Sequence, residues 1–169
     1  MRFTISQVFA APPGEVLVAL SNPSYLARMA ELPDLSAPVV EDQQRTPTTV
    51  HQRLRFQFAG SLPDIVTKVI DPQRLSWHEF TEIDLATASA TFRMVPIHYQ
   101  KFFTCAGSWQ LVPTELHHTT HTTRTIQGEL KVNSPVPFVG GRVEKAIVSG
   151  LRERLAHEPS VFASWRANS

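Results

Sequence analysis

The sequence has little of several features that mark special classes of protein. Its 169 residues include one cysteine, Cys105, so no internal disulfide can form, and a reducing intracellular compartment fits best. No apolar run approaches the ~18 residues of a membrane span, and the N-terminus lacks the apolar core of a signal peptide. We therefore expect a cytoplasmic protein with no membrane span.

An excess of charge of one sign is also missing. Lys and Arg number 16 against 15 Asp and Glu, which gives a formal net charge of +1, and no run of like charge stands out. A nucleic-acid-binding protein normally shows a basic cluster, so no nucleic acid is expected as a partner. Because no repeat, low-complexity segment or linker interrupts the chain, we expect residues 1–169 to form a single domain with a substantial core.

What the sequence does contain is a series of segments that alternate between apolar and polar residues, as half-buried strands do. The clearest lies at 49–59, where one face is apolar and the other carries His51, Arg53 and Arg55. This pattern indicates an antiparallel sheet with one face in water. Strands are predicted at 2–10, 39–45, 49–59, 74–84, 88–95, 101–112 and 116–132, with a turn at 113–115.

Helices are predicted at two places. Two short ones follow the first strand, at 12–20 and 24–32, with Asn22 as a candidate N-cap of the second. A long amphipathic one is predicted at 139–158, about 30 Å long at ~1.5 Å per residue. Its apolar stripe is Val139, Val143, Ile147, Leu151 and Leu155. Residues 62–70 leave two interpretations open, a helical turn or a strand.

Pro159 lies inside the periodic run of the long helix. Proline removes one helical hydrogen bond and clashes with the preceding turn, so we expect a kink or a restart there. Phe162 and Trp165 continue the apolar pattern and are expected to pack on the sheet.

The order of elements and two motifs resemble the START-like superfamily, also called the helix-grip, SRPBCC or polyketide-cyclase-like fold. The motifs are PGEVLVALSNPSY at 13–25 and ELKVNSPVPFVGGRVEKAIVSGLRERL at 129–155, followed by FASW at 162–165. They are similar to an actinobacterial branch of the superfamily defined as a domain of unknown function. The resemblance implies an α+β fold in which a curved antiparallel sheet of about seven strands wraps around the long C-terminal helix, with two short helices after strand 1.

Three histidines near residue 120 suggest a metal site, but their spacing argues against one. On a strand, His117 and His121 would lie about 13 Å apart, whereas one ion holds its ligands at ~2.1 Å. His118 would point to the opposite face. We therefore expect solvated histidines and no metal or other cofactor, and we expect Cys105, on the apolar side of its strand, to be a buried inert thiol.

Two charged residues are predicted to point into the interior. By alternation Arg124 shares a face with Ile126, and Glu79 shares a face with Trp77. An inward charge is costly unless it is paired or wet. Arg124 is therefore a candidate for binding a ligand carboxylate, with Glu79 as its resting partner. The alternative is a β-bulge that turns either residue outward.

The functional prediction is non-catalytic binding of a small apolar or amphipathic molecule in a cavity between the sheet and the C-terminal helix. A helix about 10 Å across does not fill a strongly curved sheet, and ligand pockets are mostly apolar with few orienting polar groups. The alternatives are a cyclase- or dehydratase-type enzyme and a structural or regulatory protein with a filled core; a homodimer is compatible with the sequence. The predicted cavity lining is Phe56, Phe58, Trp77, Phe92, Met94, Phe103, Trp109 and Arg124.

Overall fold

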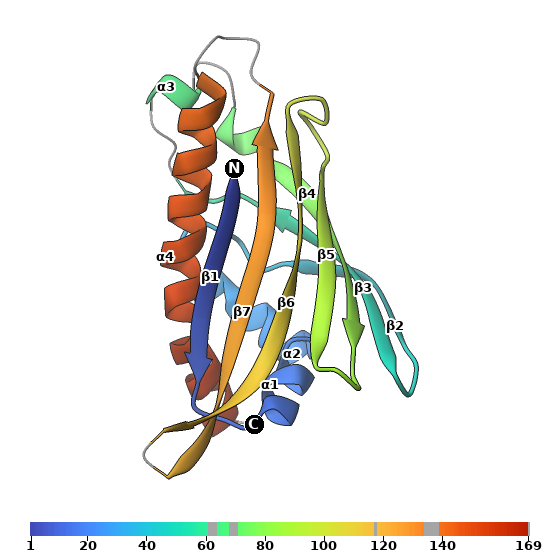
Figure 1. Cartoon of the computed structure of the whole chain (residues 1–169). Coiled ribbons are helices and arrows are strands. Elements are labelled where there is room, and N and C mark those ends of the chain that lie inside the picture. The colour runs from blue at the N-terminus through green and yellow to red at the C-terminus, as the bar shows by residue number, and fades with distance from the viewer. Residues whose placement is uncertain (61–63, 68–70, 117, 134–138, 169) are drawn as a thin grey trace.

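The computed structural model describes residues 1–60, 64–67, 71–116, 118–133 and 139–168. Seven antiparallel strands form one open, curved sheet, and a long C-terminal helix lies along its concave side (Figure 1). In chain order the elements are β1 (Arg2–Phe9), α1 (Pro13–Ala19), α2 (Pro23–Arg28), the 3-10 turn η1 (Met29–Glu31), β2 (Val39–Arg45), β3 (Thr49–Gln57), α3 (Asp64–Thr67), the 3-10 turn η2 (Pro72–Arg74), β4 (Ser76–Asp84), β5 (Ser89–Pro96), β6 (Phe103–Leu116), β7 (Thr119–Val132) and α4 (Val139–Ala167).

The strands lie in the order β1-β7-β6-β5-β4-β3-β2, so the first strand pairs with the last. Facing residues form rows across the concave face; one row runs from Ile5 to Ile126 and Trp109. Two facing glycines, Gly107 and Gly128, leave room for aromatic rings on this face. A Cβ on Gly128 would lie 2.5 Å from Cζ of Phe3, so only glycine fits there.

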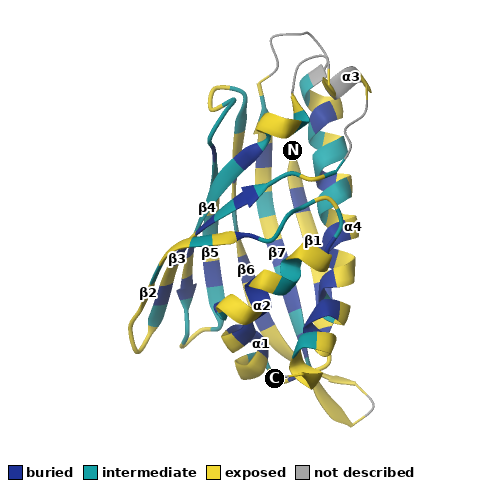
Figure 2. Cartoon of the chain, turned by 180° about the vertical axis from the view of Figure 1, so that it is seen from behind, coloured by how far each residue is buried: buried dark blue, intermediate teal, exposed yellow. Residues whose placement is uncertain are grey.

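The predicted alternation is confirmed along most strands. In β1 every second residue is buried and the others are exposed, and β3 follows the same pattern (Figure 2). The helical interpretation of 62–70 is confirmed for Asp64–Thr67, and the rest of that segment lies outside the described residues. Within the described part of the chain no helix is long and apolar enough to cross a membrane.

The helix α4 packs mainly on β1 and β7, at one side of the sheet (Figure 1). Of its predicted stripe, Val143 and Leu155 are buried, Ile147 and Leu151 are half-buried, and Val148 is buried in addition. A step of four residues overshoots a turn of 3.6, so a fixed step drifts around the helix and away from the buried side.

One sequence prediction is wrong, and one alternative of a second is absent. The predicted turn at 113–115 is part of β6, which runs to Leu116. The last residue of β6 that pairs with β5 is Gln110, opposite Ser89, so residues 111–116 extend beyond the end of β5. Pro113 therefore has no β5 residue beside it that needs its missing N–H. Consequently Leu116 and His118 do not lie on the inner face of β7; His118 is in the turn between the strands, with φ 61°. Of the kink or restart expected at Pro159, the restart is absent, since α4 is one helix.

Candidate functional site

The buried apolar residues of the described chain form two clusters, and Met29 packs against both. The larger surrounds Phe9 and Phe162, and half-buried Phe92, Met94 and Phe103 pack against it. The smaller contains Leu26, Leu54 and Phe56, with half-buried Trp77 packed against it. On the concave face Glu79 stands in β4 between Leu54 of β3 and Met94 of β5. Glu79 therefore lies between a residue of the smaller cluster and a residue packed against the larger one.

Arg124 lies in the larger cluster and points inward, as the sequence predicts. It is 5% exposed, and its guanidinium forms an ion pair with Glu158 of α4. Its Nε donates to Oε1 of Gln7 at 2.7 Å, and its Cζ lies 5.4 Å from the ring centre of Phe9. The predicted resting partner, Glu79, is not the residue that pairs with it; Glu158 is.

Glu158 is the centre of this buried network. It is 1% exposed and also accepts from Nε2 of Gln7 at 2.9 Å and from the hydroxyl of Tyr25 at 3.1 Å. Burial, together with the Glu158 carboxylate, raises the pKa of Tyr25, so the phenol stays protonated and remains a donor. The network joins β1, β7, α2 and α4, and each charge in it has partners.

Gln7 also compensates for the proline in α4. Pro159 has no N–H, so the carbonyl of Leu155, four residues earlier, loses its helical donor. Nε2 of Gln7 donates to that carbonyl at 2.5 Å. The buried carbonyl is therefore satisfied from β1, and α4 continues through the proline.

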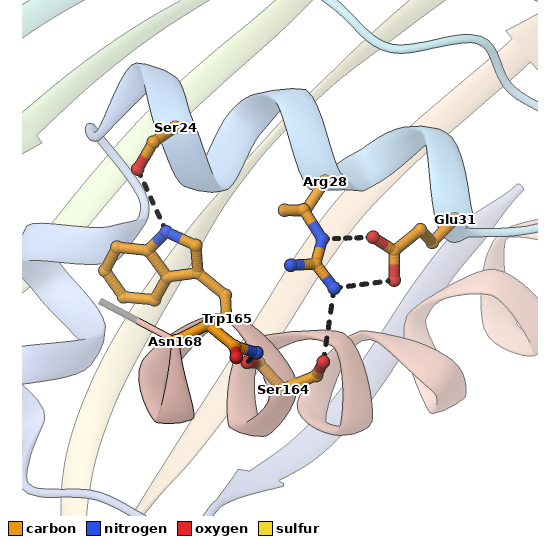
Figure 3. A network of polar contacts seen from close by, with 6 residues as sticks. All are labelled: Ser24, Arg28, Glu31, Ser164, Trp165 and Asn168. Carbon is orange, nitrogen blue, oxygen red and sulfur yellow. Dashed lines mark hydrogen bonds and ion pairs between the residues drawn. The ribbon is translucent and has the colours of Figure 1, made fainter.

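The last turns of α4 are attached to α2 by a second polar network, shown in Figure 3. Nε1 of Trp165 donates to the hydroxyl of Ser24 at 2.9 Å, and Arg28 donates to the hydroxyl of Ser164 at 3.1 Å. Arg28 also pairs with Glu31. These contacts, with the ring of Phe162 5.4 Å from that of Phe9, close this end of the interior.

A second buried arginine, Arg154, has different surroundings from Arg124. It is 8% exposed and lies one turn before Glu158 on α4, with its Cζ 6.0 Å from the ring centre of Phe56. Its Nη1 is buried without a hydrogen-bond partner, and within the described residues Arg154 forms no ion pair. Burial lowers the pKa of Arg154 to about 10, against the attraction of the Glu158 and Glu79 carboxylates, so it is a cation at neutral pH.

A second unpartnered donor reaches the same ring. The indole of Trp77 is stacked on Phe56, with ring centres 5.6 Å apart and planes 12° apart. Its Nε1 is buried and has no hydrogen-bond partner among the described residues. Buried donors are almost always satisfied in proteins, so two such donors beside one ring are unusual.

Glu79 is a titratable group that lies between the two clusters on the sheet. Burial raises the pKa of its carboxyl, although the hydroxyl of Thr81 donates to Oε1 at 3.2 Å and two guanidinium groups oppose the shift. Cys105 is buried as predicted, and burial followed by the charge of Glu79 raises the pKa of its thiol to about 12. A thiol with this pKa is not a nucleophile at neutral pH.

The residues predicted to line a cavity fall into three groups. Phe56, Trp109 and Arg124 are buried, and Trp77, Phe92, Met94 and Phe103 are half-buried on the concave side. Phe58 lies past the end of β3, bridged to Leu35, and belongs to neither cluster. Two surface hollows, of about 590 and 380 Å³, lie on the outer face of the sheet and are lined largely by polar side chains such as Glu82 and Thr91.

Sequence reasoning missed Arg154, Glu158, Gln7 and Tyr25 as interior polar residues. A signal for two of them was present, because Arg154 and Glu158 follow Leu151 by three and seven positions and so share its face of the helix. Charged residues on the apolar stripe of a helix need a partner or a ligand.

These elements define a helix-grip fold, and three solved structures share it. A protein of Thermus thermophilus, TTHA0849, is 16% identical with a TM-score of 0.65, and the match covers all of both chains. The Zhui aromatase/cyclase of Streptomyces sp. R1128 is 13% identical with a TM-score of 0.61, over 99% of this chain and 94% of that one. Norcoclaurine synthase of Thalictrum flavum is 13% identical with a TM-score of 0.56, over 100% and 96%. At these identities the likeness concerns the fold alone.

The chain belongs to the family described as "Protein of unknown function (DUF2505)", whose sequence pattern matches residues 4–165. No curated protein matches the sequence.

Proposed function

We propose that the protein binds a small apolar or amphipathic molecule between the concave face of β3–β6 and the helix α4. The proposal is supported by the exposure and the hydrogen bonding of the side chains there. Large apolar residues remain partly accessible, and two buried donors, Nη1 of Arg154 and Nε1 of Trp77, have no partner among the described residues.

The large apolar side chains on this face are less buried than those of a filled core. Trp77, Phe92, Met94 and Phe103 are all half-buried, so each forgoes part of the about 1.5–3 kcal/mol by which full burial stabilises such a side chain relative to full exposure. An unsatisfied buried donor costs a further ~1–3 kcal/mol. A ligand that covers the apolar surface and accepts from the donors removes both costs, which favours a binding protein over a structural one.

The test is the binding of a neutral apolar probe, N-phenyl-1-naphthylamine, whose fluorescence rises in an apolar site. We expect saturable binding with displacement by decanamide, and several-fold weaker binding by Met94→Gln, which places a polar group of similar volume on the concave face. Val112→Thr, a polar swap of similar size on the exposed part of β6, is the matched control and should bind as the unmodified protein does. The proposal fails if the unmodified protein gives no saturable signal.

A second candidate, catalysis of the cyclase or dehydratase type, rests on Glu79. Its raised pKa is typical of a general acid, and it stands on the concave face near two guanidinium groups. Two structures with this fold carry enzyme names, aromatase/cyclase and norcoclaurine synthase. Turnover of a bound compound that Glu79→Gln abolishes without weakening binding would favour this candidate; release of every bound compound unchanged would exclude it.

A further inference from the structure

We infer that the ligand carries an acidic oxygen, a carboxylate or a phenolate, and that Arg154 and Trp77 bind it at the ring of Phe56. This inference rests on the proposed function and names the chemical class that the same site takes. Glu79, Arg124 and Glu158 each have a hydrogen bond, whereas Nη1 of Arg154 and Nε1 of Trp77 have no partner in the described part of the chain.

The charges of the interior point to an anion. Arg124 and Glu158 neutralise one another in their ion pair. Arg154 remains a cation, and two further carboxyls attract it: that of Glu79, whose burial favours the neutral form, and that of Asp34, an exposed residue. The interior around Phe56 therefore carries one uncompensated positive charge, and a buried cation without a partner is costly.

The identity of the donors restricts the acceptor further. A guanidinium and an indole N–H donate only, so the group that satisfies both must be an acceptor. The side chains that carry the two donors both lie beside the Phe56 ring, with Cζ of Arg154 6.0 Å and the ring centre of Trp77 5.6 Å from its centre. The inferred ligand therefore places its acceptor oxygen next to this ring. An apolar body covering Phe92 and Met94 with an oxygen anion at Arg154 matches what the face offers.

Arg124, by contrast, is not the residue that selects the acid. Its guanidinium already serves Glu158 and Gln7, and a ligand carboxylate would have to displace one of them. The carboxylate role that the sequence suggests for Arg124 is thus assigned to Arg154, on the helix side of the same interior.

The experiment compares matched acids and amides by displacement of N-phenyl-1-naphthylamine. The pairs are decanoic acid with decanamide and 2-naphthoic acid with 2-naphthamide, each below its aggregation concentration. A charge-assisted hydrogen bond in a buried site predicts about tenfold tighter binding of the acid in the unmodified protein. Arg154→Met should remove this preference by weakening binding of the acid about tenfold more than binding of the amide, whose carbonyl loses only a hydrogen bond without the ionic attraction.

Three further variants sharpen the result. Arg152→Met, two positions away on the exposed side of α4, should keep the full preference for the acid. Trp77→Phe, which keeps a ring but removes Nε1, should reduce the preference several-fold. Arg154→Gln serves if Arg154→Met does not fold, and it should show the same loss.

The outcomes separate the two claims. Equal binding of acid and amide by the unmodified protein, or a preference that survives in both Arg154 variants, overturns the inference and leaves the proposed function standing. Absence of binding by probe, acid and amide alike overturns the proposed function itself.

Discussion

Arg124 and Arg154 are both more than nine-tenths buried, yet the surroundings of the two charges differ. Around Arg124 lies a packed half, formed by β1, β7, α2 and the end of α4, in which the buried polar groups pair with one another. Around Arg154 lies the concave face of β3–β6, called the open half here because Trp77, Phe92, Met94 and Phe103 are half-buried and two donors lack partners within the described chain. Under the proposed function, the first set of residues holds the fold and the second set binds the ligand.

The largest expected effect comes from breaking the packed half at its centre. Glu158→Leu leaves the Arg124 guanidinium buried without its counter-ion, and we expect it to lower the free energy of unfolding by about 3–5 kcal/mol. Urea denaturation at neutral pH measures this loss. The exposed pair of Arg166 and Glu15 supplies the control, because Glu15→Gln should change stability by less than ~1 kcal/mol.

The double variant Arg124→Met with Glu158→Leu tests whether the loss of stability comes from the unpaired charge. Replacing both charges by apolar groups removes the stranded charge, so it should recover much of the loss. If it is less stable than Glu158→Leu alone, the cost lies in packing and not in the unpaired charge.

A smaller effect is expected where β1 completes α4. Gln7→Leu leaves the Leu155 carbonyl without a donor and should cost about 1–3 kcal/mol. In a Pro159→Ala background the helix supplies its own N–H at residue 159, so part of the cost of Gln7→Leu should disappear. A double-mutant cycle from unfolding curves measures the coupling, and additive effects would contradict the role given to Gln7.

The smallest effect concerns pH and the open half. The pKa of Glu79 is raised in the folded protein, so between the ordinary glutamate pKa and the raised value the folded state holds more protons than the unfolded one. Stability contributed by this group is therefore present at low pH and is lost as pH rises through that window. Glu79→Gln should reduce this loss, so the variant should be more stable than the unmodified protein at pH values above the raised pKa of Glu79. Parallel pH profiles for the two proteins would show that Glu79 is not buried in a charge-disfavouring site.

Much of the fold could be predicted from the sequence, because alternation and helical spacing are local. The inward direction of Arg124 followed from counting along one strand, and β1 was recognised in the same way. The prediction at Pro113 was wrong because a strand tolerates proline where the neighbouring strand has already ended. Where the neighbouring strand ends depends on the whole sheet and cannot be read from the local sequence.

The candidate site was less predictable, because its contacts join distant parts of the chain. Arg124 and Glu158 are 34 residues apart, and Gln7 lies 151 positions from Glu158. No local pattern indicates which inward carboxyl an arginine contacts. Strand alternation predicts Glu79 as the partner of Arg124, whereas the observed partner is Glu158 on α4. The charge pattern at Arg154 and Glu158 on the apolar side of α4 was the available signal.

The most direct measurement is the unfolding free energy of Arg124→Met beside that of Arg154→Met, without ligand. Arg124→Met should be destabilised by about 3–5 kcal/mol, because Glu158 is left as an unpaired buried charge. Arg154→Met removes a buried cation that forms no ion pair in the described chain, so it should be as stable as the parent or more stable. A loss in Arg154→Met as large as that in Arg124→Met would contradict the account, because Arg154 would then support the fold and would not be reserved for a ligand.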